Sequence, residues 1–363
     1  MVAKNQLEFQ AQGLLKVLVQ QPFCLIKTCK VMKFSETIGI DVSRNWIDAR
    51  MHLAREQRRF DNTNGGYRKL IEWVEKKLVV SKEVILFAFE HTGLYSYGLS
   101  CFLSSGGYHF ILIPGLELHR SMGIVRGKED RIDATKLALF AYRRKDEIVP
   151  YQMPVRIIDH LRHLLSLRGR LVVQRAGYQA SLKENARFLQ KNQDPDFFQI
   201  HDRMIHYLSK QIERIDLKLN STIQQDQNIN HLFELICSIK GVGPQTAYYM
   251  IVLTHGFLLF SEWRKFASYA GTAPFPYQSG TSIRGKTKVN HMANKKIKSL
   301  LHSCAMSAII YNPEMKAYYT RRSESGKSKM STLNIIRNKI LARIFAVATR
   351  GTPYVDTHKY ASV

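Results

Sequence analysis

Short apolar runs alternate with helically spaced apolar residues along the first half of the chain. Four segments have the apolar or alternating pattern of strands: 37–41, 46–53, 83–90 and 108–113. The first two are separated by a short polar turn, which predicts a hairpin. Three segments have helical spacing: 67–77, 94–103 and 130–144, the last with Leu137, Phe140 and Ala141 on its buried side. Strands that alternate with helices predict an α/β layer architecture.

The pattern changes after residue 150. Residues 155–230 form long helical stretches rich in Leu, Arg, Gln and Lys, interrupted near 192–195, and Leu208, Ile212, Ile215 and Leu219 lie on one apolar seam. This pattern is typical of a helical hairpin or a coiled-coil arm. From Leu232 onward the chain is helical and basic, so the C-terminal domain is expected to be mostly α.

These patterns divide the chain into five parts. They are an N-terminal extension (1–33), an α/β domain (34–150), a helical linker (151–231), a basic C-terminal domain (232–350) and a tail (351–363). The extension has no clear period, and strand patterning begins directly after Met32, so Met32 is an alternative start. A signal peptide is disfavoured because Lys16 and the segment 20–22 break its apolar run.

The charge of the chain points to a polyanionic partner. Its 363 residues hold 54 Lys and Arg against 29 Asp and Glu, which gives a formal net charge of +25 and a pI near 9.9. Residues 284–350 hold 15 of these cations and two acids, Glu314 and Glu324. Charge alone does not separate a nucleic-acid enzyme from a ribosome-associated or membrane-surface protein.

Two further classes of protein are disfavoured by composition. Five cysteines without a CxxC pair support neither a disulfide framework nor a zinc site, and the apolar runs are shorter than the roughly 20 residues of a membrane helix. We therefore expect a soluble protein of a reducing cytoplasm that does not enter a membrane.

Four carboxylates occupy positions from which they can converge. Asp41 and Glu90 each end a predicted strand, and the two acids emerge at one sheet edge if those strands are adjacent and parallel. Asp130 and Asp133 lie three residues apart at the start of a helix, hence on one face. Clustered carboxylates raise one another's pKa unless cations such as Mg²⁺ neutralise them. A pair of such cations supports phosphodiester cleavage.

Each of these acids also has a structural interpretation. Asp130 is a candidate helix N-cap, Asp133 a candidate solvated helix residue, and Glu90 a candidate strand-end residue before a turn. The joint pattern in a strongly basic chain favours the metal-site interpretation over three separate structural roles.

The segments around these acids resemble a known family. They are Ile38-Gly39-Ile40-Asp41-Val42-Ser43, Phe89-Glu90-His91-Thr92-Gly93-Leu94-Tyr95 and Lys128-Glu129-Asp130-Arg131-Ile132-Asp133-Ala134. They resemble the DEDD-type insertion-sequence transposases of the IS one-ten family, also described as bridge-RNA-guided serine recombinases, and the resemblance runs from about Phe34 to Thr349. It implies an RNase H-like (RuvC-like) N-terminal domain in which all four acids hold Mg²⁺.

The C-terminal half resembles the same family. The matching segments are Tyr269-Ala270-Gly271-Thr272-Ala273-Pro274, Gln278-Ser279-Gly280, Arg284-Gly285 and a helix with Asn294-Lys295-Lys296. The resemblance implies that Ser279 attacks a DNA phosphate to form a phosphoserine, at a composite site with the carboxylates, and that a structured guide RNA selects the DNA. We further expect a bacterial protein that joins the nucleoid when active, and a homo-oligomer, either a dimer or a tetramer. Without the resemblance, Gln278-Ser279-Gly280 is typical of a plain turn.

Several basic and glycine residues are candidates for binding nucleic acid. Arg284, Lys286 and Lys288 are expected to meet the charge that develops on a phosphorane, and Lys295 and Lys296 to bind DNA. Gly241 and Gly243, within Ile239-Lys240-Gly241-Val242-Gly243-Pro244, fit a helix-hairpin-helix turn whose backbone amides bind a phosphate. The alternative is a tight turn between helices with no ligand.

Three functions are compared. The first is an RNA-guided transposase that cuts and rejoins DNA. The second is a Holliday-junction resolvase, which shares the carboxylate fold but has no need of Ser279. The third is a non-catalytic nucleic-acid-binding protein, in which Asp41 has no role.

Overall fold

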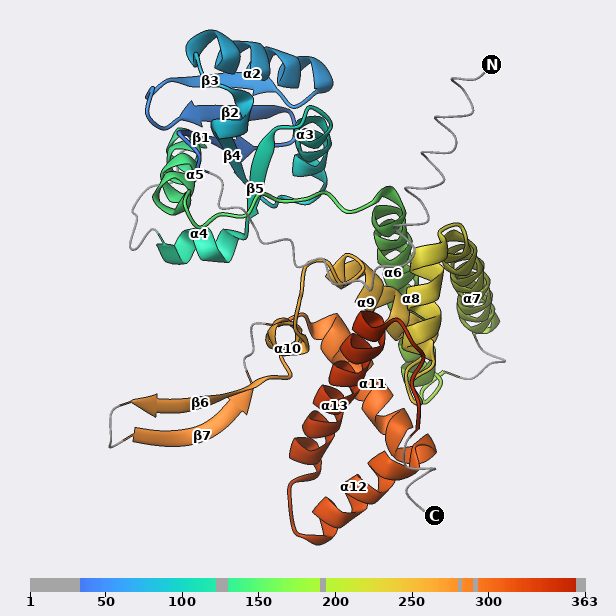
Figure 1. The fold of residues 1–363 in the computed structure, drawn as a ribbon. Helices are drawn as coiled ribbons and strands as arrows, with labels where there is room; N and C mark the ends of the chain where they lie inside the picture. The colour runs from blue at the N-terminus through green and yellow to red at the C-terminus, as the bar shows by residue number, and fades with distance from the viewer. Residues whose placement is uncertain (1–32, 122–129, 190–193, 280–282, 290–292, 357–363) are drawn as a thin grey trace, which may run out of the picture. The chain divides into compact units, whose positions relative to one another are not determined.

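The chain folds into two compact units. The computed structural model describes residues 33–121, 130–189, 194–279, 283–289 and 293–356. Its contacts place the described residues up to 153 in one unit and those from 154 in the other (Figure 1). The N-terminal extension and its alternative start at Met32 lie outside the described residues.

The first unit contains a mixed five-stranded sheet. Its strands are β1 (Glu36–Val42), β2 (Trp46–Met51), β3 (Gln57–Asp61), β4 (Ile85–Glu90) and β5 (His109–Ile113). Their order is β3-β2-β1-β4-β5, with β2 antiparallel to both β1 and β3, and with β4 parallel to both β1 and β5. The sequence predicted the other four strands but missed β3, whose Arg-rich sequence lacks an apolar run.

Helices cover both faces of this sheet. The unit contains α2 (Asn64–Lys77), η1 (Lys82–Val84), α3 (Leu94–Ser105), α4 (Gly115–Ser121) and α5 (Asp130–Arg144). Alternate residues of β1 and β4 pack against α2 and α3, while Leu86 and Ala88 pack against Leu137, Phe140 and Ala141 of α5, the buried side that the sequence predicted (Figure 1). This arrangement is consistent with the RNase H-like fold that the resemblance implies.

Helix α5 lies directly on the backbone of β1. A Cβ at Gly39 would collide with backbone atoms of Ala134 and Ala138, and the Thr37 hydroxyl donates a hydrogen bond of 2.9 Å to the Ala138 carbonyl. Thr37 of β1 contacts Ala138 of α5, whereas Gly39, which is closer to Asp41, also contacts Ala134. The two elements are therefore antiparallel, and the start of α5 lies at the Asp41 end of β1.

Substitution of Gly39 tests this contact. We expect Gly39→Ala to lower the free energy of unfolding by about 2–3 kcal/mol, because the new methyl group forces α5 away from the sheet. Urea denaturation measures the change. Gly65→Ala in α2 is the matched control, since the nearest atom to a Cβ there is the Thr63 hydroxyl at 3.9 Å, and its stability should not fall. Equal stability of the two variants would contradict the tight contact.

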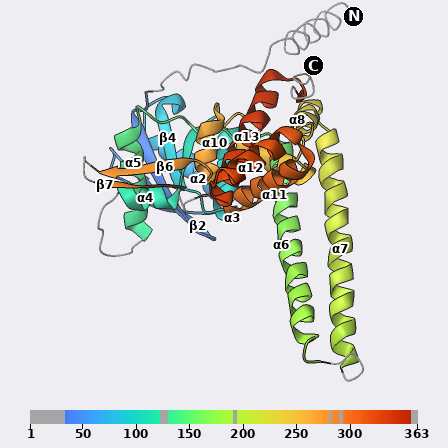
Figure 2. The ribbon, with the colours of Figure 1, turned by 90° about the horizontal axis from the view of Figure 1, so that it is seen from below.

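The second unit begins with two long helices. They are α6 (Arg156–Asn185) and α7 (Pro195–Gln224), which lie side by side as the sequence predicted (Figures 1 and 2). The seam residues Leu208, Ile212, Ile215 and Leu219 are all buried. Arg168 of α6 forms a two-point ion pair with Asp216 of α7, with its Nε atom 2.6 Å from Oδ1. The interruption predicted near 192–195 falls partly outside the described residues.

The rest of this unit is a helical core with a β-ribbon. The elements are α8 (Gln227–Cys237), α9 (Pro244–Thr254), α10 (Trp263–Ala270), β6 (Pro274–Ser279), β7 (Ile283–Val289), α11 (Lys295–Tyr311), α12 (Pro313–Glu324) and α13 (Lys329–Arg350). Most of the buried residues lie on α8, α9, α11 and α13. The antiparallel ribbon β6–β7 was not predicted, because polar residues, Gly and Pro conceal its alternation.

Candidate active site

Two carboxylates lie near the ends of adjacent parallel strands: Asp41 is the last residue but one of β1, and Glu90 is the last residue of β4. Residue Ile40 of β1 pairs with Phe89 of β4, so Asp41 and Glu90 occupy the next position along each strand. Neighbouring strands lie about 4.8 Å apart, which brings the two residues side by side at the carboxyl edge of the sheet. The condition that the sequence left open, adjacent and parallel strands, is met.

Both acids belong to the face that α5 covers. Gly39 and Ala88 both contact α5. Asp41 lies two residues after Gly39 and Glu90 two residues after Ala88, so both acids are on the same face of the sheet. Glu90 is partly buried, and its Oε1 atom lies where a Cβ of Gly115 would stand. Any side chain at position 115 would therefore displace the Glu90 carboxylate.

The start of α5 brings the third and fourth acids to this end of the sheet. Asp130 is the first residue of α5, but its side chain lies outside those described. Asp133 is partly exposed, and its Oδ1 accepts a bond of 2.7 Å from Lys136 Nζ. Among the described side chains, no group of three or more His, Cys, Asp or Glu is close enough to hold a metal ion.

One buried hydroxyl at this edge has no hydrogen-bond partner among the described residues. It is Oγ1 of Thr92, two residues after Glu90. A buried hydroxyl without a partner costs about 1–3 kcal/mol, so a bound ligand or water there is favoured. Hydroxyl and carboxylate oxygens are the kinds of group that a hydrated divalent cation binds.

Asn62 forms hydrogen bonds to the loops that follow Asp41 and Glu90. Its Nδ2 atom donates to the Ser43 carbonyl after β1 at 2.7 Å and to the Tyr95 carbonyl at the start of α3 at 3.1 Å. Its Oδ1 atom accepts a hydrogen bond from the Tyr67 hydroxyl. Burial, with a smaller contribution from Cys101, raises the pKa of Tyr67, which keeps this hydroxyl protonated as a donor. No sequence pattern pointed to Asn62, which stands in an ordinary polar turn.

Loss of the Asn62 side chain should loosen both loops. We expect Asn62→Ala to reduce the free energy of unfolding by about 2–3 kcal/mol, because it removes three hydrogen bonds and leaves part-buried groups without partners. Thermal and urea unfolding measure the loss. In the control Asn45→Ala the removed side chain is exposed, and no loss is expected. A comparable loss in both variants would argue against this role of Asn62.

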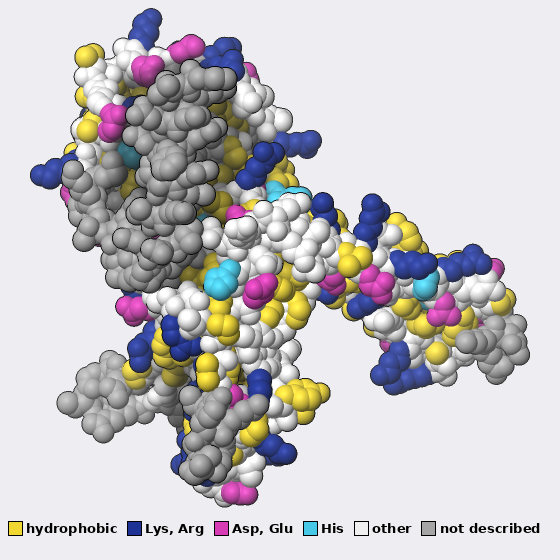
Figure 3. Space-filling model, turned by 45° about the vertical axis from the view of Figure 1, so that its right-hand side comes forward, with side chains coloured by type: hydrophobic (Ala, Val, Ile, Leu, Met, Phe, Trp, Pro, Cys, Tyr) yellow, Lys and Arg dark blue, Asp and Glu magenta, His cyan; other side chains and the backbone are white. Residues whose placement is uncertain are grey.

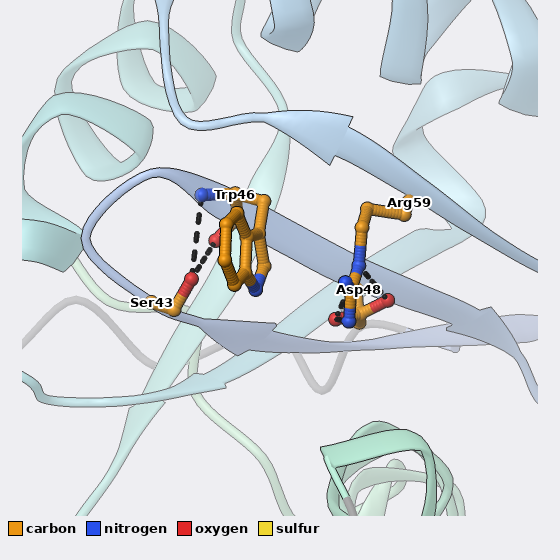
Figure 4. A network of polar contacts seen from close by, with 4 residues as sticks. All are labelled: Ser43, Trp46, Asp48 and Arg59. Carbon is orange, nitrogen blue, oxygen red and sulfur yellow. Dashed lines mark hydrogen bonds and ion pairs between the residues drawn. The ribbon is translucent and has the colours of Figure 1, made fainter.

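Two other acids of the sheet bind groups of the chain itself. The buried Glu36 carboxylate accepts hydrogen bonds from the backbone amides of Thr37, His52, Leu53 and Ala54. Asp48 pairs across the strands with Asp41 and forms a two-point ion pair with Arg59 (Figure 4). Because Arg59 offsets its charge, Asp48 adds little repulsion to the carboxylates at Asp41 and Glu90.

The proposed nucleophile and its basic neighbours lie on the ribbon of the second unit. Ser279 is the last residue of β6, and its backbone pairs with Ile283 of β7. Arg284, Lys286 and Lys288 are all on β7, and Lys288 is exposed. The side chains of Ser279, Arg284 and Lys286 lie outside those described, so their contacts stay predictions.

The two glycines of the predicted helix-hairpin-helix turn differ in their surroundings. Gly241 has φ of 93°, and a Cβ there would approach Ala308 of α11 to 2.9 Å, so packing alone accounts for its lack of a side chain. Gly243 is exposed at the N-cap of α9, with nothing near a Cβ. A backbone hydrogen bond already joins Gly243 to the Cys304 side chain. Phosphate binding at this turn stays a prediction.

Two predicted DNA-binding lysines are exposed at the start of α11. They are Lys295 and Lys296, and Lys296 Nζ lies 5.6 Å from the centre of the Tyr249 ring. Lys and Arg side chains also appear on both described units in the view of Figure 3.

No helix among the described residues is long and apolar enough to cross a membrane.

Comparison with known proteins decides the family. A model described as "Transposase", for DEDD transposases of IS110, matches residues 38–187, and one described as "Transposase IS116/IS110/IS902 family" matches residues 233–320. The chain belongs to the IS110 family of transposases. This is the family that the motifs around Asp41, Glu90 and Ser279 resemble.

Relatives of this IS110-family transposase extend the match. A pilin gene-inverting protein of Moraxella bovis is 27% identical over 331 residues, which cover 87% of this chain and 97% of the relative. An insertion element IS110 protein of 43.6 kDa from Streptomyces coelicolor is 30% identical over 135 residues, or 36% of this chain and 33% of that protein. As a transposase, the chain acts on DNA, which accounts for its basic charge. Its matched DEDD domain is of a kind that binds divalent metal.

Proposed function

We propose that this transposase cuts and rejoins the DNA of an insertion sequence at the edge of the sheet that carries Asp41 and Glu90. The observation that carries the proposal is the pairing of these two acids at the ends of parallel strands, on the face where α5 begins. Carboxylates that lie close together are stabilised when cations neutralise them. A non-catalytic binding protein, the third function considered, would not need Asp41 and Glu90 at this edge.

Asp41, Glu90, Asp130 and Asp133 would hold the cation, for which we propose Mg²⁺. When bound, a divalent cation lowers the proton affinity of an attacking oxygen and offsets charge on the leaving oxygen. Lys136 now holds Asp133 through an ion pair, so this lysine would release the carboxylate on cation binding. Asn62 holds the loops after β1 and at the start of α3, which keeps Asp41 and Glu90 side by side.

Ser279 is the proposed nucleophile, as the family resemblance implies. Its oxygen forms a bond to a DNA phosphorus while the bond from that phosphorus to a deoxyribose oxygen breaks. The serine proton passes to a base, and the departing oxygen takes up a proton. Arg284, Lys286 and Lys288 would offset the negative charge that develops on the phosphorane. Attack by a DNA hydroxyl on the phosphoserine would then rejoin the strands.

Selection of the DNA is proposed to rest on a structured guide RNA that pairs with donor and target. Gly243, Lys295 and Lys296 would contact the nucleic-acid backbone, which positions the strands without reading their sequence. The Moraxella relatives are described as gene-inverting proteins, which favours a second candidate outcome, inversion of a flanked segment by the same chemistry.

A plasmid recombination assay tests the function. The full chain is expressed in cells that also carry its flanking element DNA, and this DNA is transcribed in the same cells. The DNA junctions that excision, insertion or inversion would create are then amplified. Recombinant junctions that appear only with the chain support the proposal. DNA that is bound but never rearranged, in cells and with purified protein in Mg²⁺ or Mn²⁺, would leave the binding-protein alternative in place.

A further inference from the structure

An exposed tryptophan begins β2 beside the carboxylate edge. Trp46 is 40% exposed. It alternates with Asp48, so both side chains belong to the α5 face of the sheet, and Asp48 is the cross-strand partner of Asp41. Trp46 thus leaves part of a large aromatic ring accessible to a ligand, two residues from the cross-strand partner of a candidate catalytic acid.

Arg59 is fixed over this ring by Asp48. The guanidinium carbon lies 5.0 Å from the centre of the Trp46 ring, and Arg59 Nε and Nη2 donate to the Asp48 carboxylate at 3.0 and 2.7 Å (Figure 4). The side chain of Asp48 is 5% exposed, whereas that of Arg59 is 50% exposed. The buried carboxylate therefore holds the arginine in one orientation while half of the arginine side chain faces solvent.

We propose that Trp46 and Arg59 bind a DNA strand at the carboxylate edge, with Trp46 stacked on an unpaired base and Arg59 on the adjoining phosphate. The inference rests on the proposed function, because it concerns the strand presented to Asp41 and Glu90. Aromatic rings bind unpaired bases of any sequence, and a planar guanidinium suits both phosphate binding and stacking. Since Asp48 has already ordered Arg59, binding requires little further loss of side-chain entropy.

The strand β3 supplies a matched control. Arg58 is adjacent to Arg59 in sequence, exposed and equally charged, but it lies on the opposite face, 5.5 Å from the centre of the Phe60 ring. Arg58→Ala thus removes the same charge from the same strand without touching the proposed platform.

Binding of the full chain to DNA with a single-stranded segment tests the proposal. Fluorescence anisotropy is measured at about 0.2 M salt, where long-range charge attraction is weakened. We expect Trp46→Leu and Arg59→Ala each to weaken binding about tenfold, Trp46→Phe to retain most of it, and Arg58→Ala to match the wild type. Wild-type-like affinity in Trp46→Leu, or equal losses in Arg58→Ala and Arg59→Ala, would overturn the proposal. A loss confined to single-stranded RNA would overturn it as well.

Cross-linking gives a direct readout of stacking. DNA that carries 5-iodouracil in its single-stranded segment is irradiated with the wild-type chain, and adducts are mapped by mass spectrometry. We expect an adduct at Trp46, and adducts elsewhere without one at Trp46 would contradict the platform. Failure of the proposed function is distinguishable, because it appears as continued recombination by Asp41→Asn, whatever Trp46 binds.

Discussion

Replacement of Asp41 by Asn, or of Glu90 by Gln, is expected to reduce recombination by about 1,000-fold or more. Each change keeps the size of the side chain but removes a negative oxygen that would hold the cation. The folded structure should persist, because neither Asp41 nor Glu90 belongs to the buried apolar clusters on the two faces of the sheet. Recombinant junctions, counted by quantitative amplification, measure the effect.

The control for these variants lies in η1, just before the strand that carries Glu90. Glu83 is exposed just before β4, at the opposite end from Glu90, so Glu83→Gln removes one charge away from the site and should recombine normally. A second readout is the rise in melting temperature with Mg²⁺ or Mn²⁺, which we expect in the wild type and in Glu83→Gln but not in Asp41→Asn. Full recombination by Asp41→Asn would refute the carboxylate site.

Ser279→Ala is expected to abolish both recombination and the covalent protein–DNA adduct. The variant keeps the four acids, so the metal-induced rise in melting temperature should be unchanged. Denaturing gels of labelled DNA, with and without protease, measure the adduct. Ser299→Ala, the same change on an exposed position of α11, should behave as the wild type.

The serine variant separates two enzyme classes. A resolvase that uses only the carboxylates would continue to cut junction DNA after Ser279→Ala. If cleavage persists in Ser279→Ala but is lost in Asp41→Asn, the carboxylates alone carry out DNA cleavage. Loss in both variants would join the two units of the chain in one reaction.

Apolar patterning predicted much of the first unit. The strands that end at Asp41 and Glu90 carry continuous buried residues, so each was visible from its own sequence, and the same holds for Leu137 and Ala141 in α5. Strand β3 was missed because Arg58 and Arg59 face solvent, and only Phe60 enters the core. The ribbon whose first strand ends in Ser279 was missed for a similar reason: few of its described residues pack into the helical core.

The sequence predicted the acids of the proposed site but not the residues around them. Asp41 and Glu90 stand at strand ends, where a local pattern reveals them, and their pairing follows from strand order. Asn62, Thr92 and the Asp48–Arg59 pair depend on contacts between segments that the sequence did not align. Once β3 is known, the position of Arg59 opposite Asp48 is evident from its register.

The contact between Gly39 and α5 bears on how this protein tolerates change. Besides its apolar contacts, the helix is positioned by its own backbone atoms, which lie against a residue without a side chain. Core side chains such as Leu137 are thus free to be exchanged for others of similar volume over evolutionary time. A lineage can diverge widely in its interior while the carboxylate edge keeps its dimensions.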